Sequence, residues 1–447
     1  MEVSVDNTDA SGLAGVERRR RRRAFHLLLA SGSIMASLGV GWCVFFAWRG
    51  AWPVALVELA LALLGVAVIA MARLRRARAA SWVAFVGVTA LLCFFSAFLD
   101  VPTAAIPRTS HVFLLVLALC AHHVFRAEKA WLRYGAVVLL LVLFAAFAAA
   151  PAAVPDRFAI GDEVRRVGIW VNLATVVLSF LVVMRLAESD IAGHRALHAL
   201  RDALAHRRFE LLYQPQVDAG GRIVGAEALL RWRDARRGVI HPDDFMQTAE
   251  ETGFILPLGQ WVLQAACRQL RAWQAEPALR HLRLSVNISA LQLRQPDFVQ
   301  QVGDALARAE VDPRQLTLEL TESVLVDDMG DAVGKMRALH ATGVRLSLDD
   351  FGTGYSSLSY LRELPFAEMK IDRAFTREVL RDGSAATITR NLLRLGRDLG
   401  VDVIAEGIED AGQFALLREQ GCGLFQGYLF GRPMDAQAFR RSVEQVP

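Results

Sequence analysis

The sequence predicts two structural classes in one chain: an α-helical membrane bundle of about six spans, followed by an α/β modified TIM-type barrel with one antiparallel strand. Hydrophobic residues make up 54% of the 447 residues, and their excess lies within residues 24–186, where charges occur only in short clusters. From Phe209 onward, strand-like apolar runs alternate with amphipathic helical stretches, a pattern typical of α/β barrels.

The chain divides into four predicted parts. Residues 1–23 are polar and end in six arginines, Arg18 to Arg23, which indicates a basic cytoplasmic tail rather than a cleavable signal peptide. Residues 24–186 are the transmembrane part, which we interpret as a sensor domain. Residues 187–208 carry leucines at helical spacing and are expected to form a signalling helix that links the halves. Residues 209–447 form the soluble domain.

Six apolar stretches account for the predicted spans. Most reach the roughly 20 residues that a helix needs to cross a bilayer, and the fourth is the shortest. Basic residues precede the first stretch and follow the second and the fourth, so both termini are predicted on the cytoplasmic side. The stretches are residues 24–48, 51–72, 82–99, 111–125, 134–154 and 169–186.

Charge and cysteine content exclude several classes of protein. The net charge of +4 lies largely beside the apolar runs, so it indicates membrane topology, and no DNA or RNA polymer is expected as a partner. The five cysteines are scattered, without the spacing of metal ligands or of a disulfide framework. The soluble part is therefore expected to be a reduced, cytoplasmic domain.

Eight strands are predicted in the soluble part. Only four residues separate the first two, which must therefore be antiparallel, because a parallel crossover needs about a dozen residues or more. Helix-length segments separate the others, which indicates a barrel with one reversed strand. The predicted strands are residues 209–217, 222–232, 282–287, 316–320, 344–349, 368–372, 402–405 and 424–428.

Polar residues gather at the downstream ends of these strands. In a barrel the carboxyl ends of the strands meet at one face, so these side chains are expected to lie together. So many carboxylates repel one another without cations, and oxygen ligands without clustered Cys or His indicate paired Mg²⁺ or Mn²⁺ ions. Isolated helix caps are the alternative reading of each residue taken alone. The residues are Glu227, Asn287, Glu319, Glu322, Asp349, Asp350, Lys370, Asp372, Glu406 and Gln426.

An ordered set of motifs in residues 211–434 resembles the EAL family of cyclic di-GMP phosphodiesterases. The triplet Glu227-Ala228-Leu229 alone carries little information, and the order of seven blocks makes the resemblance specific. Two positions depart from the family pattern, Ala367 and Ile408, and neither is an expected ligand. The blocks are Tyr213-Gln214-Pro215, Asn287-Ile288-Ser289, Glu319-Leu320-Thr321-Glu322, Asp349 through Leu358, Lys370-Ile371-Asp372, Ala405-Glu406-Gly407 and Gln426-Gly427-Tyr428.

The resemblance implies a role for each matching residue. Two ions, Mg²⁺ or Mn²⁺, are expected on Glu227, Asn287, Glu319, Asp349, Asp350 and Glu406. Lys370 is expected to orient or deprotonate the attacking water, with a pKa lowered by the two cations, and Glu406 and Glu227 complete the catalytic set. Glu322 is expected to steady the loop after Asp350. Substrate contacts are expected from Gln214, Arg231, Asp372 and Gln426.

The resemblance also implies the activity and its setting. Cyclic di-GMP is expected to be hydrolysed to linear pGpG by a multi-pass protein of the bacterial inner membrane, with the N-terminus and the catalytic domain in the cytoplasm. A homodimer through the catalytic domain is expected. A catalytically silent cyclic di-GMP receptor and a transporter with an attached regulator are the alternatives. The intact set of ligands and base favours the enzyme over the receptor.

Overall fold

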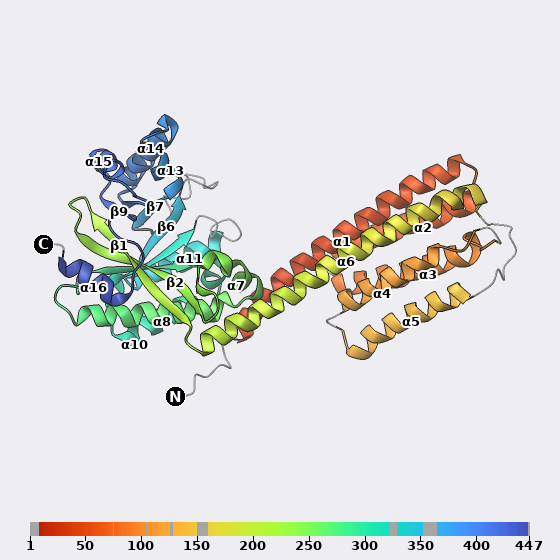
Figure 1. The fold of residues 1–447 in the computed structure, drawn as a ribbon, viewed down its shortest axis with the longest axis horizontal. Helices are drawn as coiled ribbons and strands as arrows, with labels where there is room; N and C mark the ends of the chain where they lie inside the picture. The colour runs from red at the N-terminus through yellow and green to blue at the C-terminus, as the bar shows by residue number, and fades with distance from the viewer. Residues whose placement is uncertain are drawn as a thin grey trace. The chain divides into compact units, whose positions relative to one another are not determined.

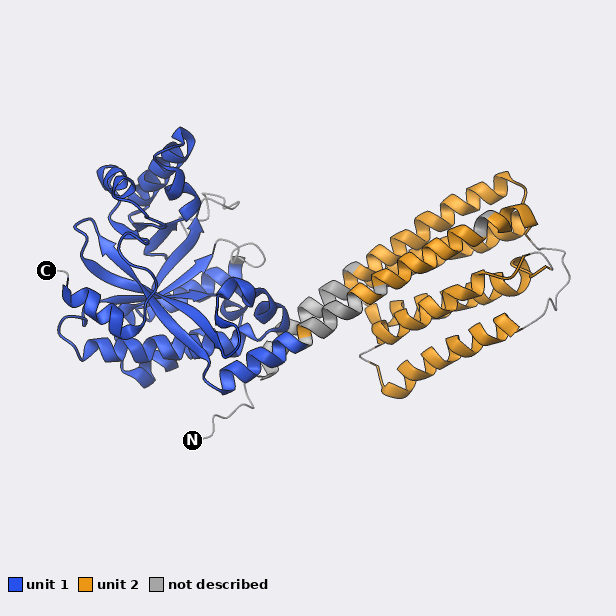
Figure 2. Cartoon of the chain, viewed as in Figure 1, with its two compact units in different colours: residues 1–16, 195–447 blue, residues 17–194 orange. Residues whose placement is uncertain are grey.

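The computed structural model of the chain describes residues 9–74, 76–103, 106–125, 128–149, 160–321, 329–351 and 364–445. The chain divides into two compact units, one of residues 17–194 and one of residues 1–16 with 195–447 (Figure 2). Helix α6 (Asp162–Ala205) belongs to both units, and the predicted signalling helix, residues 187–208, falls in it as far as Ala205.

The first unit consists of helices (Figure 1). Five stretches in it are long and apolar enough to cross a membrane, namely Leu27–Trp48, Trp52–Arg73, Ala77–Leu99, Ala130–Ala149 and Asp162–Val182. The fourth predicted span is a shorter apolar helix, Ser110–Val124. The prediction of a helical bundle of about six spans is confirmed. The elements are α1 (Asp9–Trp48), α2 (Trp52–Arg73), α3 (Ala77–Phe94), η1 (Phe95–Leu99), η2 (Ser110–Val112), α4 (Phe113–Val124), α5 (Ala130–Ala149) and α6.

Small residues allow α1 and α2 to pack backbone against backbone. A side chain at Gly39 would begin 2.6 Å from the backbone nitrogen of Ala62, and one at Gly65 would begin 2.6 Å from the carbonyl oxygen of Gly32. Membrane helices pack in this way because lipid offers no hydrophobic drive for helix association, so close van der Waals contact has to supply it.

Ion pairs at the two ends of α3 show that α3 and α4 run in opposite directions. Arg78, at the start of α3, donates to both carboxylate oxygens of Glu128, which lies between α4 and α5, at 2.6 Å each. Asp100, just after η1 at the other end, pairs with Arg165 in the first turn of α6 at 3.1 Å. The short helix α4 therefore runs from one end of this unit to the other.

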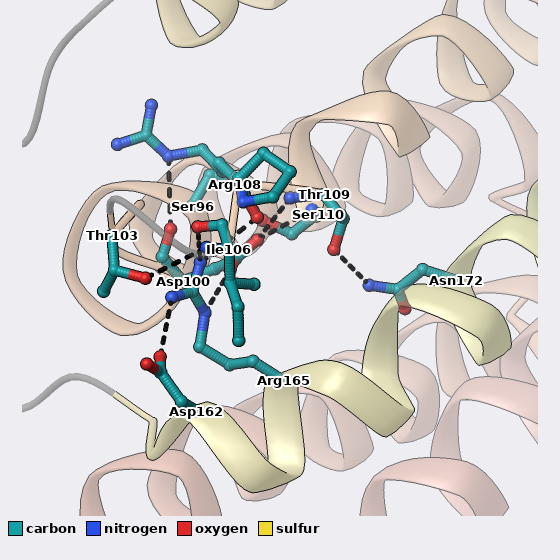
Figure 3. Close-up of polar contacts among 11 residues, drawn as sticks. Ser96, Asp100, Thr103, Ile106, Arg108, Thr109, Ser110, Asp162, Arg165 and Asn172 are labelled. Atoms are coloured by element: carbon teal, nitrogen blue, oxygen red, sulfur yellow. Dashed lines mark hydrogen bonds and ion pairs between the residues drawn. The ribbon is translucent and has the colours of Figure 1, made fainter.

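The Asp100–Arg165 pair is buried and ties a loop to α6 (Figure 3). The Asp100 carboxylate accepts hydrogen bonds from the backbone nitrogens of Thr109 at 2.8 Å and Ser110 at 2.9 Å. The Arg165 guanidinium donates to the carbonyl oxygen of Ile106 at 3.2 Å. Both charges are thus hydrogen-bonded as well as paired, the condition under which buried charges are tolerated.

The second unit is a closed barrel. Strand β1 is antiparallel to both of its neighbours, β2 and β9, and the remaining neighbours within the ring are parallel. The predicted fold and its one reversed strand are confirmed, and each predicted strand matches an observed one to within two residues. The strands are β1 (Phe209–Asp218), β2 (Ile223–Asp234), β4 (Arg283–Ile288), β5 (Leu316–Thr321), β6 (Arg345–Phe351), β7 (Glu368–Ile371), β8 (Asp402–Ala405) and β9 (Leu424–Gln426).

A ninth strand, β3 (Gly238–Ile240), pairs only with β2 and lies outside the ring. The sequence analysis missed it because three residues are too few to show an alternating pattern. It belongs to a second apolar cluster, in which Leu200 and Ala203 from the end of α6 are buried with Phe209 and Trp232. The end of α6 is therefore part of the core of the barrel unit.

Helices cover the outside of the barrel. Leu316, Leu318 and Leu320 of β5 are buried in the main apolar cluster, whereas Thr317 and Glu319 alternate with them and face inward. The helices are η5 (Pro242–Asp244), α7 (Met246–Thr252), α8 (Ile255–Gln274), α9 (Ala290–Leu293), α10 (Phe298–Ala309), η6 (Pro313–Gln315), α11 (Met329–Ala341), α13 (Arg373–Glu378), α14 (Gly383–Leu399), α15 (Ala411–Glu419) and α16 (Ala436–Gln445).

Candidate active site

The barrel brings acidic side chains from four strands to one place. Glu227 lies in β2, Glu319 in β5 and Asp349 in β6, while Glu406 directly follows β8. Strand register sets their heights, because Asn287 of β4 pairs with Glu319, and Thr321 of β5 pairs with Asp349. Parallel strands present their carboxyl ends at one rim, so inward-facing polar residues there converge.

Lys370 of β7 is the point of convergence. Its ammonium nitrogen lies 2.6 Å from Glu406 Oε1, 2.9 Å from Glu319 Oε2, 3.3 Å from Asp349 Oδ1 and 3.5 Å from Glu227 Oε2. The lysine side chain is 1% exposed. Four of the six predicted metal ligands therefore contact a single buried ammonium group.

Amide side chains hold the carboxylate of Glu227 from both sides. Asn287 Nδ2 donates to Glu227 Oε1 and Gln426 Nε2 donates to Glu227 Oε2, each at 2.6 Å. Gln426 Nε2 also lies 3.3 Å from Gln214 Oε1. Gln214, Asn287 and Gln426, which the sequence singled out, therefore lie together around Glu227.

The site holds more negative than positive charge. Burial, together with the neighbouring carboxylates, raises the pKa of Glu319 well above its usual range and that of Glu406 to about 7, despite the attraction of Lys370. Burial acts to lower the pKa of Lys370, but its four carboxylate neighbours outweigh burial and raise it well above 10.5. One ammonium group does not neutralise four carboxylates, so Glu319 and Glu406 hold their protons to a higher pH than free carboxyl groups do.

The four carboxylate neighbours thus hold Lys370 as a protonated ammonium group. The predicted lowering of its pKa presupposes two cations beside it, and it stays a prediction. For Glu227, burial acts to raise the pKa, but Lys370, Gln426 and Asn287 together bring it below its usual value. Glu227 therefore ionises more readily than Glu319 or Glu406.

Asp350 and Asp372 form a second acidic pair beside the first cluster. Burial and the neighbouring carboxylates of Asp349 and Asp372 raise the pKa of Asp350 to about 6. Asp350 has a φ of 55°, in the left-handed region, and its backbone nitrogen donates to Asp349 Oδ1 at 3.0 Å. Asp372 caps α13 by accepting from the backbone nitrogen of Ala374 at 2.8 Å. The helix-cap reading therefore applies to Asp372.

Two other predicted residues, Arg231 and Glu322, are not among the side chains that contact Lys370 or Glu227 in the described structure. Arg231 is buried in β2, four residues after Glu227, and donates to the carbonyl oxygen of Leu230 at 2.7 Å. Burial lowers its pKa, against the attraction of Tyr428 and Glu227. Glu322, the predicted loop-steadying residue, falls in residues 322–328, outside the described residues, as do residues 352–363 after Asp350.

The donor set fits hard divalent cations. Among the described residues no three His, Cys, Asp or Glu side chains form a ready-made metal site, and four of the carboxylates converge on the Lys370 ammonium instead. The donors are nevertheless carboxylate and amide oxygens, which Mg²⁺ and Mn²⁺ prefer. Glu319 Oε1 is buried without a hydrogen-bond partner among these residues, and the raised pKa values mark a shortage of positive charge.

Sequence reasoning missed one residue of this site. Gln216, two residues after Gln214 in β1, is buried, and its Nε2 donates to Gln426 Oε1 at 3.0 Å. Strand alternation places residues 214 and 216 on the same face, a signal that could have identified it.

Comparisons with known proteins identify the family to which this barrel is similar. A family model described as the EAL domain matches residues 197–433, more than half of the chain. The bifunctional diguanylate cyclase/cyclic di-GMP phosphodiesterase MucR of Pseudomonas aeruginosa is 44% identical over 248 residues, which are 55% of this chain and 36% of MucR. The cyclic di-GMP phosphodiesterase PA2567 of the same species is 40% identical over 227 residues, 51% of this chain and 38% of that protein.

A solved structure described as the PaMucR phosphodiesterase in complex with c-di-GMP is 43% identical and has a TM-score of 0.53. It covers 55% of this chain, and the match takes in 99% of the solved chain. The present chain thus spans little more than a third of the length of MucR and PA2567. Because the family model matches more than half of its length, the chain belongs to the EAL domain family.

Proposed function

We propose that this protein is a membrane-anchored phosphodiesterase that hydrolyses cyclic di-GMP to linear pGpG with the help of two divalent cations. The observation that carries the proposal is the convergence of Glu227, Glu319, Asp349 and Glu406 on the buried ammonium of Lys370. Two relatives named as cyclic di-GMP phosphodiesterases, and the complex of one of them with c-di-GMP, support the choice of substrate.

The residues that would hold the ions are those with oxygen donors in or beside the cluster, namely Glu227, Asn287, Glu319, Asp349, Asp350 and Glu406. Two Mg²⁺ or Mn²⁺ ions there would supply Lewis-acid stabilisation of phosphate charge and a water molecule that is readily deprotonated. Asn287 suits this role because its Nδ2 donates to Glu227, which leaves its amide oxygen as the ligand.

Lys370 would act on the attacking water. As an ammonium group it donates hydrogen bonds and orients a water oxygen, and added positive charge beside it would favour release of its proton. Hydrolysis forms one bond from the water oxygen to phosphorus and breaks one bond from phosphorus to a ribose oxygen. The leaving oxygen takes up a proton, and the ring opens to the linear dinucleotide.

Substrate contacts would come from residues around the cluster. Arg231 lies four residues after Glu227 on the same face of β2, so its planar guanidinium can meet a phosphate or a guanine edge. Gln214 and Gln426 lie beside Glu227. Asp372 would contact substrate in addition to capping α13, and Glu322 would steady the loop that follows Asp350.

The helical unit would anchor the enzyme in the bacterial inner membrane. Large apolar side chains lie exposed along its helices, for example Leu56 and Leu63 of α2 at 63% and 62%, and Val138 and Val142 of α5 at 57% and 59%. Surfaces of this kind suit lipid rather than water. We also propose cytoplasmic termini, a homodimer through the catalytic domain, and an input signal received by the membrane unit.

The test is hydrolysis by the full-length protein in lipid vesicles. Cyclic di-GMP is incubated with the protein and Mn²⁺, and the product is identified by chromatography. We expect pGpG with Mn²⁺ or Mg²⁺ and none in EDTA. Dinucleotide that binds but stays intact after long incubation would refute the enzyme and support the receptor alternative.

A further inference from the structure

We propose that Gln216 is a positioning residue that sets the orientation of Glu227 through Gln426. The inference rests on the proposed function, because Glu227 is assigned there as a metal ligand. Gln216 Nε2 donates to Gln426 Oε1 at 3.0 Å, and Gln426 Nε2 donates to Glu227 Oε2 at 2.6 Å. The three side chains form a relay in which Gln216 itself has no contact with Lys370.

The relay works because a primary amide has one accepting and one donating end. Gln426 is 4% exposed and has Glu227 and Gln214 on one side and Gln216 on the other. As long as Gln216 donates to the oxygen of Gln426, the nitrogen of Gln426 must face the carboxylate. A rotation of that amide by half a turn would place its oxygen against Glu227 and Gln214, which also present oxygens.

The backbone prepares a place for the Gln216 side chain. Gln216 pairs directly with Gln426 across β1 and β9, and with Gly225 across β1 and β2. A side chain at Gly225 would begin 3.2 Å from Gln216 Oε1 and 2.8 Å from the carbonyl oxygen of Arg283. Gly225 therefore leaves the space into which the amide of Gln216 fits, and this space holds Gln216 in its buried position beside Gln426.

The relay complements the hold on the other oxygen of Glu227. That oxygen accepts from Asn287, which the proposed function also uses as a metal ligand, so its orientation depends on the ion. The hold through Gln426 depends only on protein side chains. Gln216 thus defines the direction of the Glu227 carboxylate before an ion arrives, so it acts on metal affinity and turnover. Because Gln426 is also proposed to contact the dinucleotide, a smaller effect on KM is expected.

The experiment compares three variants of the full-length protein in lipid vesicles. Gln216→Leu removes the donor. Gln216→Met keeps the length of the side chain but has no donor, so nothing holds the oxygen of Gln426 away from Glu227. Gln315→Leu is the matched control. Gln315 lies just before β5 and donates to the carbonyl oxygens of Arg280 and Leu282, which lie just before β4. This contact is at the opposite end of these strands from the site.

Three quantities are measured: kcat and KM for cyclic di-GMP, Mn²⁺ affinity from the electron paramagnetic resonance signal of free Mn²⁺, and melting temperature. We expect Gln216→Leu to lower kcat and Mn²⁺ affinity by about 10- to 100-fold, as for other residues that orient a metal ligand. KM is expected to rise by a smaller factor than kcat falls. Gln216→Met is expected to lower kcat and Mn²⁺ affinity to a similar extent. Gln315→Leu is expected to lower only the melting temperature.

Parental kcat and Mn²⁺ affinity in Gln216→Leu would overturn the relay. So would equal losses in Gln216→Leu and Gln315→Leu, since they would show a general loss of stability. If Gln216→Leu does not fold, parental kcat and Mn²⁺ affinity in Gln216→Met would also overturn it. A parent protein that binds Mn²⁺ but makes no pGpG would refute the proposed function, while the Mn²⁺ affinities of the variants would still decide on the relay.

Discussion

Replacing Lys370 by methionine removes the single ammonium group on which four carboxylates converge. The substitution keeps a side chain of similar length, so it tests charge rather than volume. In the absence of metal ions, the carboxylates of Glu319 and Glu406, which already have raised pKa values, would lose their nearest positive charge. We therefore expect Lys370→Met to destabilise the metal-free barrel as well as to abolish turnover.

The expected loss of stability follows from burial. Lys370 is 1% exposed and lies within 3.5 Å of each of the four carboxylates. Removing one partner of a buried ion pair typically costs about 3–5 kcal/mol, because the remaining charge stays buried without compensation. For a domain of this size each kcal/mol changes the melting temperature by about 2–4 °C, so a decrease of about 6–20 °C is expected.

The assay is thermal unfolding of the barrel segment, residues 195–447, in EDTA at pH 8 and pH 5. The decrease should be smaller at pH 5, where more of the carboxylates are protonated and need less compensation. Lys335→Met is the matched control, because Lys335 pairs with Asp331 of the same helix at 2.8 Å and Asp331 is half exposed. Its loss should stay near 0.3–0.5 kcal/mol, about the value of such helix pairs.

Added Mn²⁺ should restore part of the stability of Lys370→Met, because a divalent cation can neutralise the same carboxylates. Equal melting temperatures of Lys370→Met and its parent in EDTA at pH 8 would refute the reasoning. They would mean that the four carboxylates are already neutral without the ammonium group.

Two further predictions concern carboxylates of the Lys370 cluster, and a third concerns the Asp100–Arg165 pair of the helical unit. Glu227→Gln should lower kcat by more than about 100-fold, beyond the 10- to 100-fold typical of a residue that merely orients a ligand, and parental hydrolysis would exclude Glu227 as a ligand. Burial raises the pKa of Glu406 from 4.5 to about 7, so between these pH values the folded state binds more protons than the unfolded state. The free energy of unfolding of the metal-free barrel should therefore fall by up to about 3 kcal/mol as the pH rises from 4.5 to above 7. Urea unfolding at pH 5 and pH 8 should show a smaller loss in Glu406→Gln, and equal losses would contradict the assignment. In detergent-solubilised full-length protein, Arg165→Ala should destabilise the helical unit by about 3–5 kcal/mol by leaving Asp100 unpaired, whereas substitution of its exposed neighbour, Arg166→Ala, should leave the thermal unfolding of that unit unchanged.

Much of the fold could be predicted because it depends on local pattern. Strand boundaries follow from alternating or continuous apolar runs between turn residues, and each predicted strand lies within two residues of an observed one. The reversal of β1 followed from the four residues between the first two predicted strands, since no parallel crossover is that short. The apolar spans likewise follow from composition and length, and only the stretch at Ser110–Val124 forms a shorter helix than the others.

The candidate site was predicted as a set of residues but not as an arrangement. That Glu227, Glu319, Asp349 and Glu406 would meet could be expected from their places at strand ends. The distances that make Lys370 their common partner depend on strand register and on the closure of the ring, which no single segment contains.

By itself, the sequence determined the order and approximate limits of the eight strands of the ring, the apolar helices and the family motifs, because these are properties of neighbouring residues. Only the tertiary structure decided which side chains touch. The contact between Gln216 and Gln426 spans 210 positions, and that between Asp100 and Arg165 spans 65. Such pairs form only when distant segments are packed together, so their geometry is decided by the packing of the folded chain.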